Sequence, residues 1–322
     1  MTLSTAQSGL ATPTRFCSHC SETLPESAFA PGHRCCLSCA RRASESARLR
    51  TVKVNATRTF GVEIECKVPR LTINQVAAKI RALGIPCNSP GYSHQFVEAW
   101  KVVPDGTVHD GERTVDGHYE RYCGMEVVSR ILLGSEGVAE LKKVTRLLNR
   151  LGAFVDRQCG LHVHHGARDL ELAAWKTLAR MYVRYEPVFD SVVPPSRRLD
   201  NNGMCHTMRR YHDESTTLRQ VDNAYDIAAL RQVFGGRFVK LNITAFWRHG
   251  TVEFRQFGGT TDFAKMLNWV AFTQAMVESA HRGALVGPRV APTEAKLMNL
   301  VKPPRSVRRW FTDRAAALAA AA

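Results

Sequence analysis

Three short segments of this chain share one pattern, and that pattern constrains the fold more than any other feature. In "FGVEIE", "GLHVHHG" and "GTVEFRQF", two polar functional side chains flank one apolar residue. The functional pairs are Glu63 and Glu65, His162 and His164, and Glu253 and Arg255. Alternation with a period of two is typical of a β-strand with one apolar and one polar face. The sequence therefore predicts strands that gather acids, imidazoles and a guanidinium on one concave surface.

A fourth strand-like segment, "GMEVVS", adds Glu126 to this surface. With Glu63, Glu65 and Glu253 it contributes four carboxylates, which would raise one another's pKa values and take up protons. Two divalent cations would remove that repulsion, and oxygen ligands with an imidazole suit Mg²⁺ or Mn²⁺. Arg255 fits the same surface if an anion such as a nucleotide phosphate also binds there. This combination is the one that phosphoryl transfer requires.

The 322-residue chain is long enough for a sizeable core, and 44% of its residues are hydrophobic. It has no apolar run that would span a membrane and no apolar segment near its start, so we expect a cytoplasmic protein with no membrane partner. The net charge of +15 is concentrated in the first 60 and the last 42 residues. Basic flanks suit nucleic acid or an acidic partner, and they are equally consistent with solvated termini.

Five of the ten cysteines lie close to the N-terminus. Cys17 and Cys20 form one pair with two residues between them, and Cys36 and Cys39 form another, which is the spacing of a zinc site with four thiolates. Cys35 is the alternative to Cys36, with poorer spacing to Cys39. The module resembles the small zinc ribbons of phage and bacterial proteins. It would either serve folding alone or dock nucleic acid or protein.

Patterning along the chain predicts an α+β protein with a small zinc module. Helices are expected at 71–84, 135–152, 168–189 and 260–283, and strands at 60–66, 124–129, 159–164, 238–246 and 250–257. The polar stretch 194–236 is expected to be an irregular loop or lid. The predicted divisions are a disordered lead-in at 1–14, a zinc module at 15–42, a linker at 43–57, a catalytic domain at 58–285 and a basic, partly helical tail at 286–322.

Five segments together resemble the amidoligase family, which belongs to the carboxylate–amine ligase superfamily. They are "FGVEIE", "GMEVVS", "GAFVDRQCGLHVHHG", "FVKLNI" and "GTVEFRQFGGTTD", and they occur in the family's order between Phe60 and Ala280. The resemblance implies a glutamine-synthetase-like fold, in which a curved antiparallel sheet backed by helices forms a funnel. It also implies that ATP and two or three metal ions bind at the concave face.

The resemblance also implies roles for individual residues. Glu65 and Glu126 would bind one metal ion, and Glu63, a histidine and Glu253 would bind another. His162 is the favoured histidine because it closely follows "CGL", with His164 as the close alternative. The guanidinium of Arg255 would contact the γ-phosphate of ATP.

Three further residues are candidates for binding substrate or nucleotide. Asp105 lies in "WKVVPDGTV", where Thr107 replaces the family's usual serine, and Lys101 of the same segment is a weaker candidate. Arg197 in "PPSR" could clamp a carboxylate or phosphate. Asn242 in "KLNI" would either point into the funnel or form buried hydrogen bonds.

The implied reaction is an ATP-dependent ligation. ATP would phosphorylate a carboxylate, and an amine would then attack the acyl phosphate, with peptides as the expected substrates. Cys159 beside the histidines is expected to be a core residue and not a nucleophile. The alternatives are a guanidino-group kinase of the same superfamily, a cupin-like enzyme with a His-x-His/Glu metal site, and a zinc protein that binds nucleic acid or protein.

Overall fold

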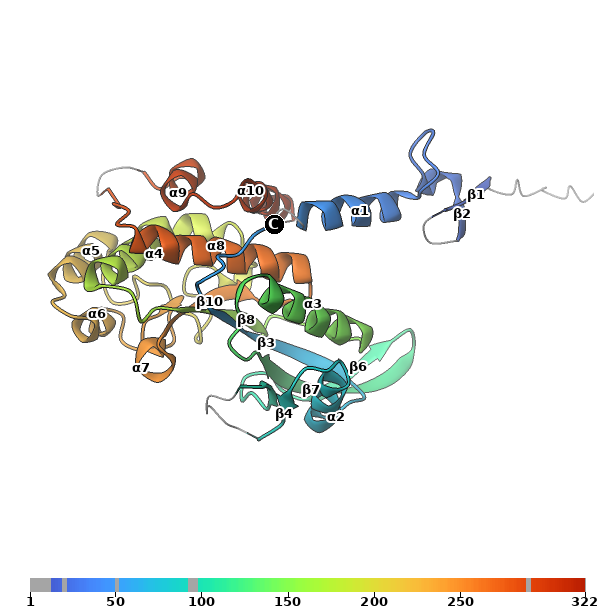
Figure 1. Ribbon diagram of the computed structural model, residues 1–322, viewed down its shortest axis with the longest axis horizontal. Coiled ribbons are helices and arrows are strands. Elements are labelled where there is room, and N and C mark those ends of the chain that lie inside the picture. The colour runs from blue at the N-terminus through green and yellow to red at the C-terminus, as the bar shows by residue number, and fades with distance from the viewer. Residues whose placement is uncertain (1–12, 19–21, 50–51, 92–97, 288–290, 322) are drawn as a thin grey trace, which may run out of the picture. The chain divides into compact units, whose positions relative to one another are not determined.

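The structure is a computed structural model, and it describes residues 13–18, 22–49, 52–91, 98–287 and 291–321 (Figure 1). The chain divides into two compact units, Met1–Thr51 and Val52–Ala322. Each unit has buried residues of its own. None of the helices in the described ranges is long and apolar enough to cross a bilayer.

The smaller unit consists of short elements around sulfur atoms. Strands β1 (Thr14–Phe16) and β2 (Thr23–Pro25) pair antiparallel, and the 3-10 helix η1 (Glu26–Ala28) follows β2. Helix α1 (Leu37–Leu49) runs beyond residue 42, so it occupies the first half of the stretch predicted to be a linker. The buried core holds Phe29 and three cysteines, which is too little apolar surface to stabilise a fold alone.

The larger unit is built on one eight-stranded sheet with the order β4-β5-β7-β3-β8-β10-β9, in which β6 pairs with β7. Its strands are β3 (Phe60–Pro69), β4 (Cys87–Asn88), β5 (Trp100–Val103), β6 (Gly111–Val115), β7 (His118–Val128), β8 (Gly160–Gly166), β9 (Leu241–Asn242) and β10 (Thr251–Gly258). All neighbours are antiparallel except β4 and β5 at one edge. The predicted α+β fold is confirmed, and the parallel edge pair corrects the expectation of a wholly antiparallel sheet.

One face of the sheet forms the core of the larger unit. The alternating apolar side chains of β3, β8 and β10 are fully buried, among them Val62, Leu161 and Phe254. In Figure 1 the helices α3 (Gly134–Arg150), α4 (Leu172–Asp190) and α8 (Phe263–His281) lie along one side of these strands. The ring of Phe257 stacks on that of Trp269 in α8 at 4.9 Å between centroids. The opposite, polar face of these strands is left for the site.

All four predicted helices are present, as α2 (Ile73–Arg81), α3, α4 and α8. Asp262 caps α8 by accepting hydrogen bonds from two backbone N–H groups. Pro187 lies within α4, close to its end, and the helix continues to Asp190.

Two sequence expectations in the second half of the chain are wrong. The stretch 194–236 is largely ordered into η2 (Pro195–Arg197), α5 (Glu214–Asn223) and α6 (Ile227–Val233). Asp213 and Asp226 cap the two α-helices, a signal that the polar composition of the stretch obscured. The expected strand at 238–246 shrinks to the two residues of β9, because α7 (Ala245–His249) begins immediately afterwards.

The C-terminal segment is part of the larger unit and not a separate tail. It forms α9 (Glu294–Val301) and α10 (Arg305–Ala320). Val307 and Phe311 of α10 are fully buried, and the ring of Phe311 lies 4.9 Å from that of Phe272 in α8. The C-terminal segment therefore packs against the larger unit through apolar side chains, which its high content of basic residues did not predict.

Candidate active site

Strand register brings the acidic side chains of β3 opposite partners on both neighbouring strands. β3 pairs with β7 so that Glu65 lies opposite Glu126. It pairs with β8 so that Glu63 lies opposite His162. Directly opposed residues of antiparallel strands have Cβ atoms about 5 Å apart, so their side chains meet. Three strands distant in sequence thus place four of the predicted residues on one small area.

The fourth strand extends this area to the other edge of the sheet. Glu253 of β10 lies opposite His164 on β8 and opposite Asn242 on β9. Nδ2 of Asn242 donates a hydrogen bond of 2.6 Å to Oε2 of Glu253, and Arg255 forms an ion pair with Oε1. Asn242 is buried and hydrogen-bonded to Glu253 beside the site, so both descriptions of its position apply, and its role in binding substrate or nucleotide stays a prediction.

Glu63, His162 and Glu253 form the first of two groups that could hold a metal ion. One donor atom from each lies within 4.8 Å of the other two. Nδ1 of His162 is 2.9 Å from Oε2 of Glu63 and 3.6 Å from Oε1 of Glu253. Two carboxylates and one imidazole are a donor set that suits Mg²⁺ or Mn²⁺.

The second group consists of Glu65, Glu126 and His162, again within 4.8 Å of one another. Nε2 of His162 is 3.5 Å from Oε1 of Glu65. The other oxygen of Glu65 accepts a hydrogen bond of 2.5 Å from the backbone N–H of Gly160. The imidazole of His162 therefore lies between the two groups. Because a neutral imidazole offers one lone pair, it can coordinate a cation on one side only.

His164 belongs to neither group. Its Nδ1 lies 2.9 Å from Oγ1 of Thr251, and its Nε2 lies 3.3 Å from Oε1 of Glu63. The ring of His249 packs edge-on against it, with 5.7 Å between ring centroids. The geometry thus favours His162 over His164 as the metal ligand and leaves His164 beside Glu63.

Charge is unevenly distributed over the four glutamates. Burial raises the pKa of Glu126, and repulsion from Glu63, Glu65 and Asp105 raises it further, well above its ordinary value. Burial opposes ionisation of Glu63 as well, but hydrogen bonds with His162 and His164 hold its pKa well below the ordinary value. Without a cation, protonation of Glu126 relieves the repulsion. A divalent cation bound here would take the place of that proton.

Two cavities meet at this cluster. The larger has a volume of about 590 Å³ and is lined by Phe60, Val128 and Ile131 together with basic side chains. The smaller has a volume of about 180 Å³ and contains Arg255 and both metal-ligand groups. The residues common to both walls are Glu63, Glu126, His164 and His249.

Arg197 and Asp105 both line the smaller cavity. Arg197 is 3% exposed; its Nη2 donates a hydrogen bond of 3.1 Å to the carbonyl of Gln158, and its Nε has no acceptor among the described residues. A Cβ atom at Gly160 would lie 3.0 Å from that Nη2, so glycine provides the space. Asp105 accepts hydrogen bonds from the N–H and the hydroxyl of Thr107, which fixes the turn.

Sequence reasoning missed His249 and Arg248, which line the smaller cavity. Both lie at the end of α7, between the segments 238–246 and 250–257 that were predicted to be strands. Gly250 ends the helix with φ of 67°, and this turn directs the two side chains toward the site. Lys101, a weaker candidate from sequence, lines the larger cavity, and burial lowers its pKa despite the nearby carboxylates of Glu63 and Glu126.

Cys159 lies one residue before β8 and is buried. Burial is the main cause that raises the pKa of its thiol to about 12. A thiol that stays protonated at neutral pH is a poor nucleophile. The structure therefore agrees with the expectation that Cys159 is a core residue.

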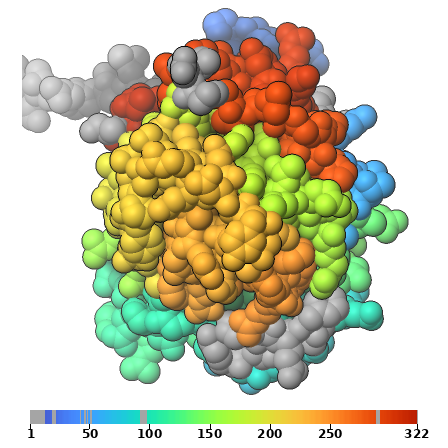
Figure 2. Space-filling model, turned by 90° about the vertical axis from the view of Figure 1, so that its left-hand side faces the viewer, coloured from blue at the N-terminus to red at the C-terminus, as the bar shows by residue number. Residues whose placement is uncertain are grey.

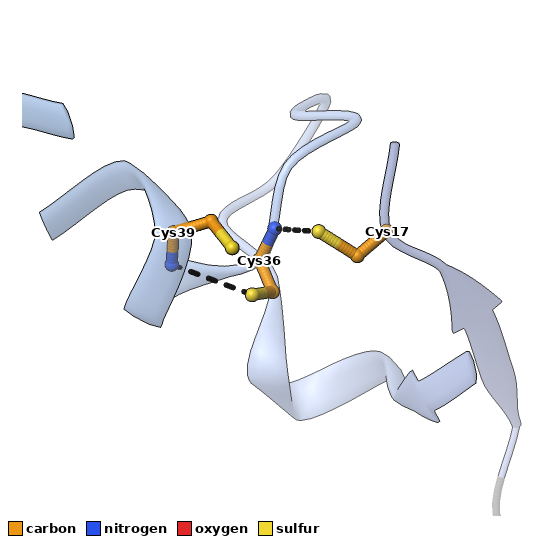
Figure 3. Close-up of side chains that lie close together, drawn as sticks. All are labelled: Cys17, Cys36 and Cys39. Atoms are coloured by element: carbon orange, nitrogen blue, oxygen red, sulfur yellow. Dashed lines mark hydrogen bonds between the residues drawn. The ribbon is translucent and has the colours of Figure 1, made fainter. Parts of the chain in front are cut away.

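In the smaller unit, three sulfur atoms converge. Cys17, Cys36 and Cys39 are buried and have their sulfur atoms within 4.8 Å of one another (Figure 3). The N–H of Cys36 donates to Sγ of Cys17, and the N–H of Cys39 donates to Sγ of Cys36. Cys35 is not part of this group, and Cys20 lies outside the described residues. The thiolate donors and their N–H···S bonds fit a zinc site.

Comparison with known proteins adds a match to a family model and a weaker likeness to solved structures. Residues 56–277 match the family model described as "Putative amidoligase enzyme". Among curated proteins, none matches the chain in sequence. A solved structure described as "Crystal structure of novel glutamine synthase homolog" is similar over 88% of this chain and 72% of that chain, with 12% identity and a TM-score of 0.36. At so low a TM-score, the fold described above stands on its own contacts.

Proposed function

The chain belongs to the amidoligase family, and from that premise we propose that it is an ATP-dependent ligase joining a carboxylate to an amine. The observation that carries the proposal is the pair of ligand groups around His162. Four carboxylates crowded on one face of a sheet are costly unless cations balance them. Transfer of a phosphoryl group requires cations at such a position, because negative charge accumulates there.

We assign two divalent cations, Mg²⁺ or Mn²⁺, to this cluster. Glu63, His162 and Glu253 would hold one, and Glu65 and Glu126 would hold the other. His162 is given to the first cation because its Nδ1 is closer to Glu63 than its Nε2 is to Glu65. When bound, the cations supply Lewis-acid stabilisation of the phosphoryl oxygens.

The two cavities suit different substrates. The larger, at about 590 Å³, is in the size range of pockets that hold nucleotide-sized ligands, and its apolar wall suits a base. The smaller, at about 180 Å³, has room for a carboxylate-bearing group beside Arg197 and Arg255. We therefore place ATP in the larger cavity, with its γ-phosphate at the shared wall, and the substrate carboxylate in the smaller one.

The reaction then proceeds between the two cavities. A carboxylate oxygen attacks the γ-phosphorus, forming a P–O bond as the bond to the ADP oxygen breaks. The amine nitrogen next attacks the acyl carbon, forming the C–N bond as the C–O bond to phosphate breaks, and the nitrogen gives up one proton to the departing phosphate or to water. Arg255 stays near the transferred group because it is anchored to Glu253. Arg197 offers its unsatisfied Nε–H to an anionic oxygen. The protein's part is positioning and charge neutralisation.

The test is release of ADP from Mg-ATP in the presence of mixed amino acids, glutamate peptides and amines. Glu63→Gln retains size and removes charge, and it should lower turnover by at least about a hundredfold while the protein stays folded. Glu112→Gln, a charge change on the β6–β7 hairpin, serves as the matched control and should retain activity. Full turnover in Glu63→Gln, or turnover without a divalent cation, would refute the site.

For the smaller unit we propose a structural zinc ion held by Cys17, Cys20, Cys36 and Cys39. The support is the convergence of the three described sulfur atoms. We also propose that this unit binds protein or nucleic acid, which its basic composition suits. None of the nine cysteines in the described ranges forms a disulfide, which supports a cytoplasmic location. The cupin-like alternative leaves Glu65, Glu126 and Arg255 without a role.

A further inference from the structure

We propose that the surface around the mouth of the smaller cavity docks an acidic polypeptide, one of whose carboxylates then enters the cavity. The inference rests on the proposed function, because it names the class of carboxylate substrate. The surface, called here the Arg–aromatic face, comprises three residue pairs: Arg210 with Tyr211, Arg231 with Trp247, and Arg237 with Phe238.

Each pair places a guanidinium over an exposed aromatic ring. The guanidinium carbon lies 5.5 Å from the ring centroid of Tyr211, 5.4 Å from that of Trp247 and 4.7 Å from that of Phe238. The exposed fractions of these aromatic residues are 54%, 50% and 37%. Large aromatic and arginine side chains are the residue types enriched in protein–protein contacts. Three such pairs on one face are more than scattered surface aromatics would provide.

The three pairs lie on connected elements. Tyr211 packs against Gly235, where a Cβ atom would lie 2.6 Å from its ring, and Gly235 precedes Arg237 by two residues. Arg231 belongs to α6, and Trp247 belongs to α7. These helices lie next to each other on the side of the larger unit that faces the viewer in Figure 2, within the yellow to orange part of the chain.

This face opens onto the site. Arg237 and Phe238 line the smaller cavity, and so does Arg248, the residue after Trp247. All three are exposed, so they mark the mouth of the cavity. A ligand that rests on the Arg–aromatic face is thus next to the opening that leads to Arg255 and the metal-ligand groups.

The charges of the face are available to a partner. Nearby arginines are paired within the chain: Arg180 with Asp222, and Arg184 and Arg209 with Glu214. Among the ion pairs of the described residues, none includes Arg210, Arg231, Arg237 or Arg248. Arg237 and Arg248 at the mouth, with Arg210 and Arg231 beside it, therefore carry positive charge that attracts an anionic chain and steers it toward the cavity.

An acidic polypeptide fits this arrangement better than a nucleic acid does. Both are anionic, and both could contact arginine and aromatic side chains. Only the polypeptide carries carboxylates, which are the group that the proposed reaction consumes. The cavity of about 180 Å³ behind the mouth admits one such side chain and not a nucleotide.

The experiment measures binding of a fluorescein-labelled oligoglutamate peptide to the full chain by anisotropy, without ATP. Arg231→Glu and Arg210→Glu should each weaken binding by about fivefold, and Trp247→Ala should weaken it by a similar factor. Arg309→Glu on α10, whose side chain is 66% exposed, makes the same charge change away from the face and should leave binding unchanged. Circular dichroism confirms that each variant is folded.

Two outcomes would overturn the inference. In the first, Arg231→Glu and Arg309→Glu weaken binding equally, which would mean that the peptide senses only net charge. In the second, oligothymidylate binds through these residues and oligoglutamate does not. Because binding is measured without turnover, failure here is separate from failure of the ligase proposal, which ADP release tests independently. In a ligase assay, Arg231→Glu should raise KM for a glutamate peptide about fivefold and leave kcat unchanged.

Discussion

The two units of this protein present their candidate metal-binding side chains in opposite ways. In Val52–Ala322 the ligands stand on neighbouring strands of a sheet whose other face is a large apolar core. In Met1–Thr51 the cysteines are themselves most of the buried core, with Phe29 as their main apolar companion. The larger unit therefore positions its candidate ligands through its fold, whereas the smaller unit, if it binds the proposed zinc ion, would depend on that ion in order to fold.

This contrast explains the different donor types. Carboxylates repel one another, so they converge only where a rigid framework holds them. For Glu253 this framework consists of the hydrogen bonds between β8 and β10 and of the contacts with Asn242 and Arg255. Thiolates around zinc form a strong, closed coordination shell that can organise a short chain by itself. A catalytic site gains from the first arrangement because its cations can exchange without loss of the fold.

The largest effect should come from Cys36→Ser. Structural zinc contributes roughly 10–16 kcal/mol of apparent binding energy in small zinc domains, so loss of one thiolate should unfold the smaller unit. Metal analysis should show about one equivalent of zinc lost, and limited proteolysis should cut within residues 13–49. The larger unit's unfolding midpoint should not move. Cys35→Ser is the matched control and should retain zinc; equal loss in both variants would contradict the assigned ligands.

The next effect tests the framework behind the site. Lys240 is fully buried and forms ion pairs with Glu186 at 2.6 Å and Asp190 at 2.8 Å. Lys240→Met leaves two buried carboxylates without their cation and should lower the free energy of unfolding by roughly 3–5 kcal/mol. Lys265→Met removes an exposed partner of Asp262 and should cost under about 1 kcal/mol. Denaturant titration of the protein measures the free energy of unfolding of both variants. Similar losses in the two variants would show that the buried ion pairs of Lys240 do not support the larger unit.

A smaller effect concerns pH. In protein freed of divalent cations, the raised pKa of Glu126 means that the folded state binds more protons than the unfolded state above the ordinary glutamate pKa. Its contribution to stability is complete below that ordinary value and is lost as pH rises through the folded pKa. Glu126→Gln should remove this loss and raise the unfolding midpoint of the chelated protein at neutral pH. If the unfolding midpoint depends on pH in the same way in the variant and in the unmodified protein, the pKa of Glu126 is not the one that repulsion raises.

The smallest effect lies far from either metal group. Asp262 caps α8 through hydrogen bonds to the N–H groups of Ala264 and Lys265. Asp262→Ala should lower the free energy of unfolding of the larger unit by about 1 kcal/mol, with no change in zinc content. Asp313→Ala, on the exposed face of α10, should change it by less than about 0.5 kcal/mol. A loss of zinc in Asp262→Ala would show that the two units are not independent.

Several features of this protein were decided by local sequence. The period of two in β3, β8 and β10 assigned Glu63, Glu253 and His162 to one face, because alternate side chains of a strand point to opposite sides. The four helices α2, α3, α4 and α8 were likewise predicted from local patterning. A wide apolar stripe at helical spacing has few alternatives.

Other features depend on contacts between distant segments, which one sequence does not encode locally. Register decides which side chains face each other, since β3 places Glu63 opposite His162 while β10 places Glu253 opposite His164. The parallel pairing of β4 with β5 and the docking of Phe311 on α8 depend equally on partners far along the chain.

The polar stretch 194–236 shows most clearly that contacts between distant segments cannot be predicted from local sequence. Its helices α5 and α6 have weak apolar stripes and were mistaken for a loop. Few of their side chains are buried within the larger unit, with Val221 of α5 and Leu230 of α6 as the apolar ones. Sequence alone determined which chemical groups share a face, because that depends on backbone geometry over a few residues. Tertiary structure decided which of those groups meet, because register and docking are set by burial summed over the whole core.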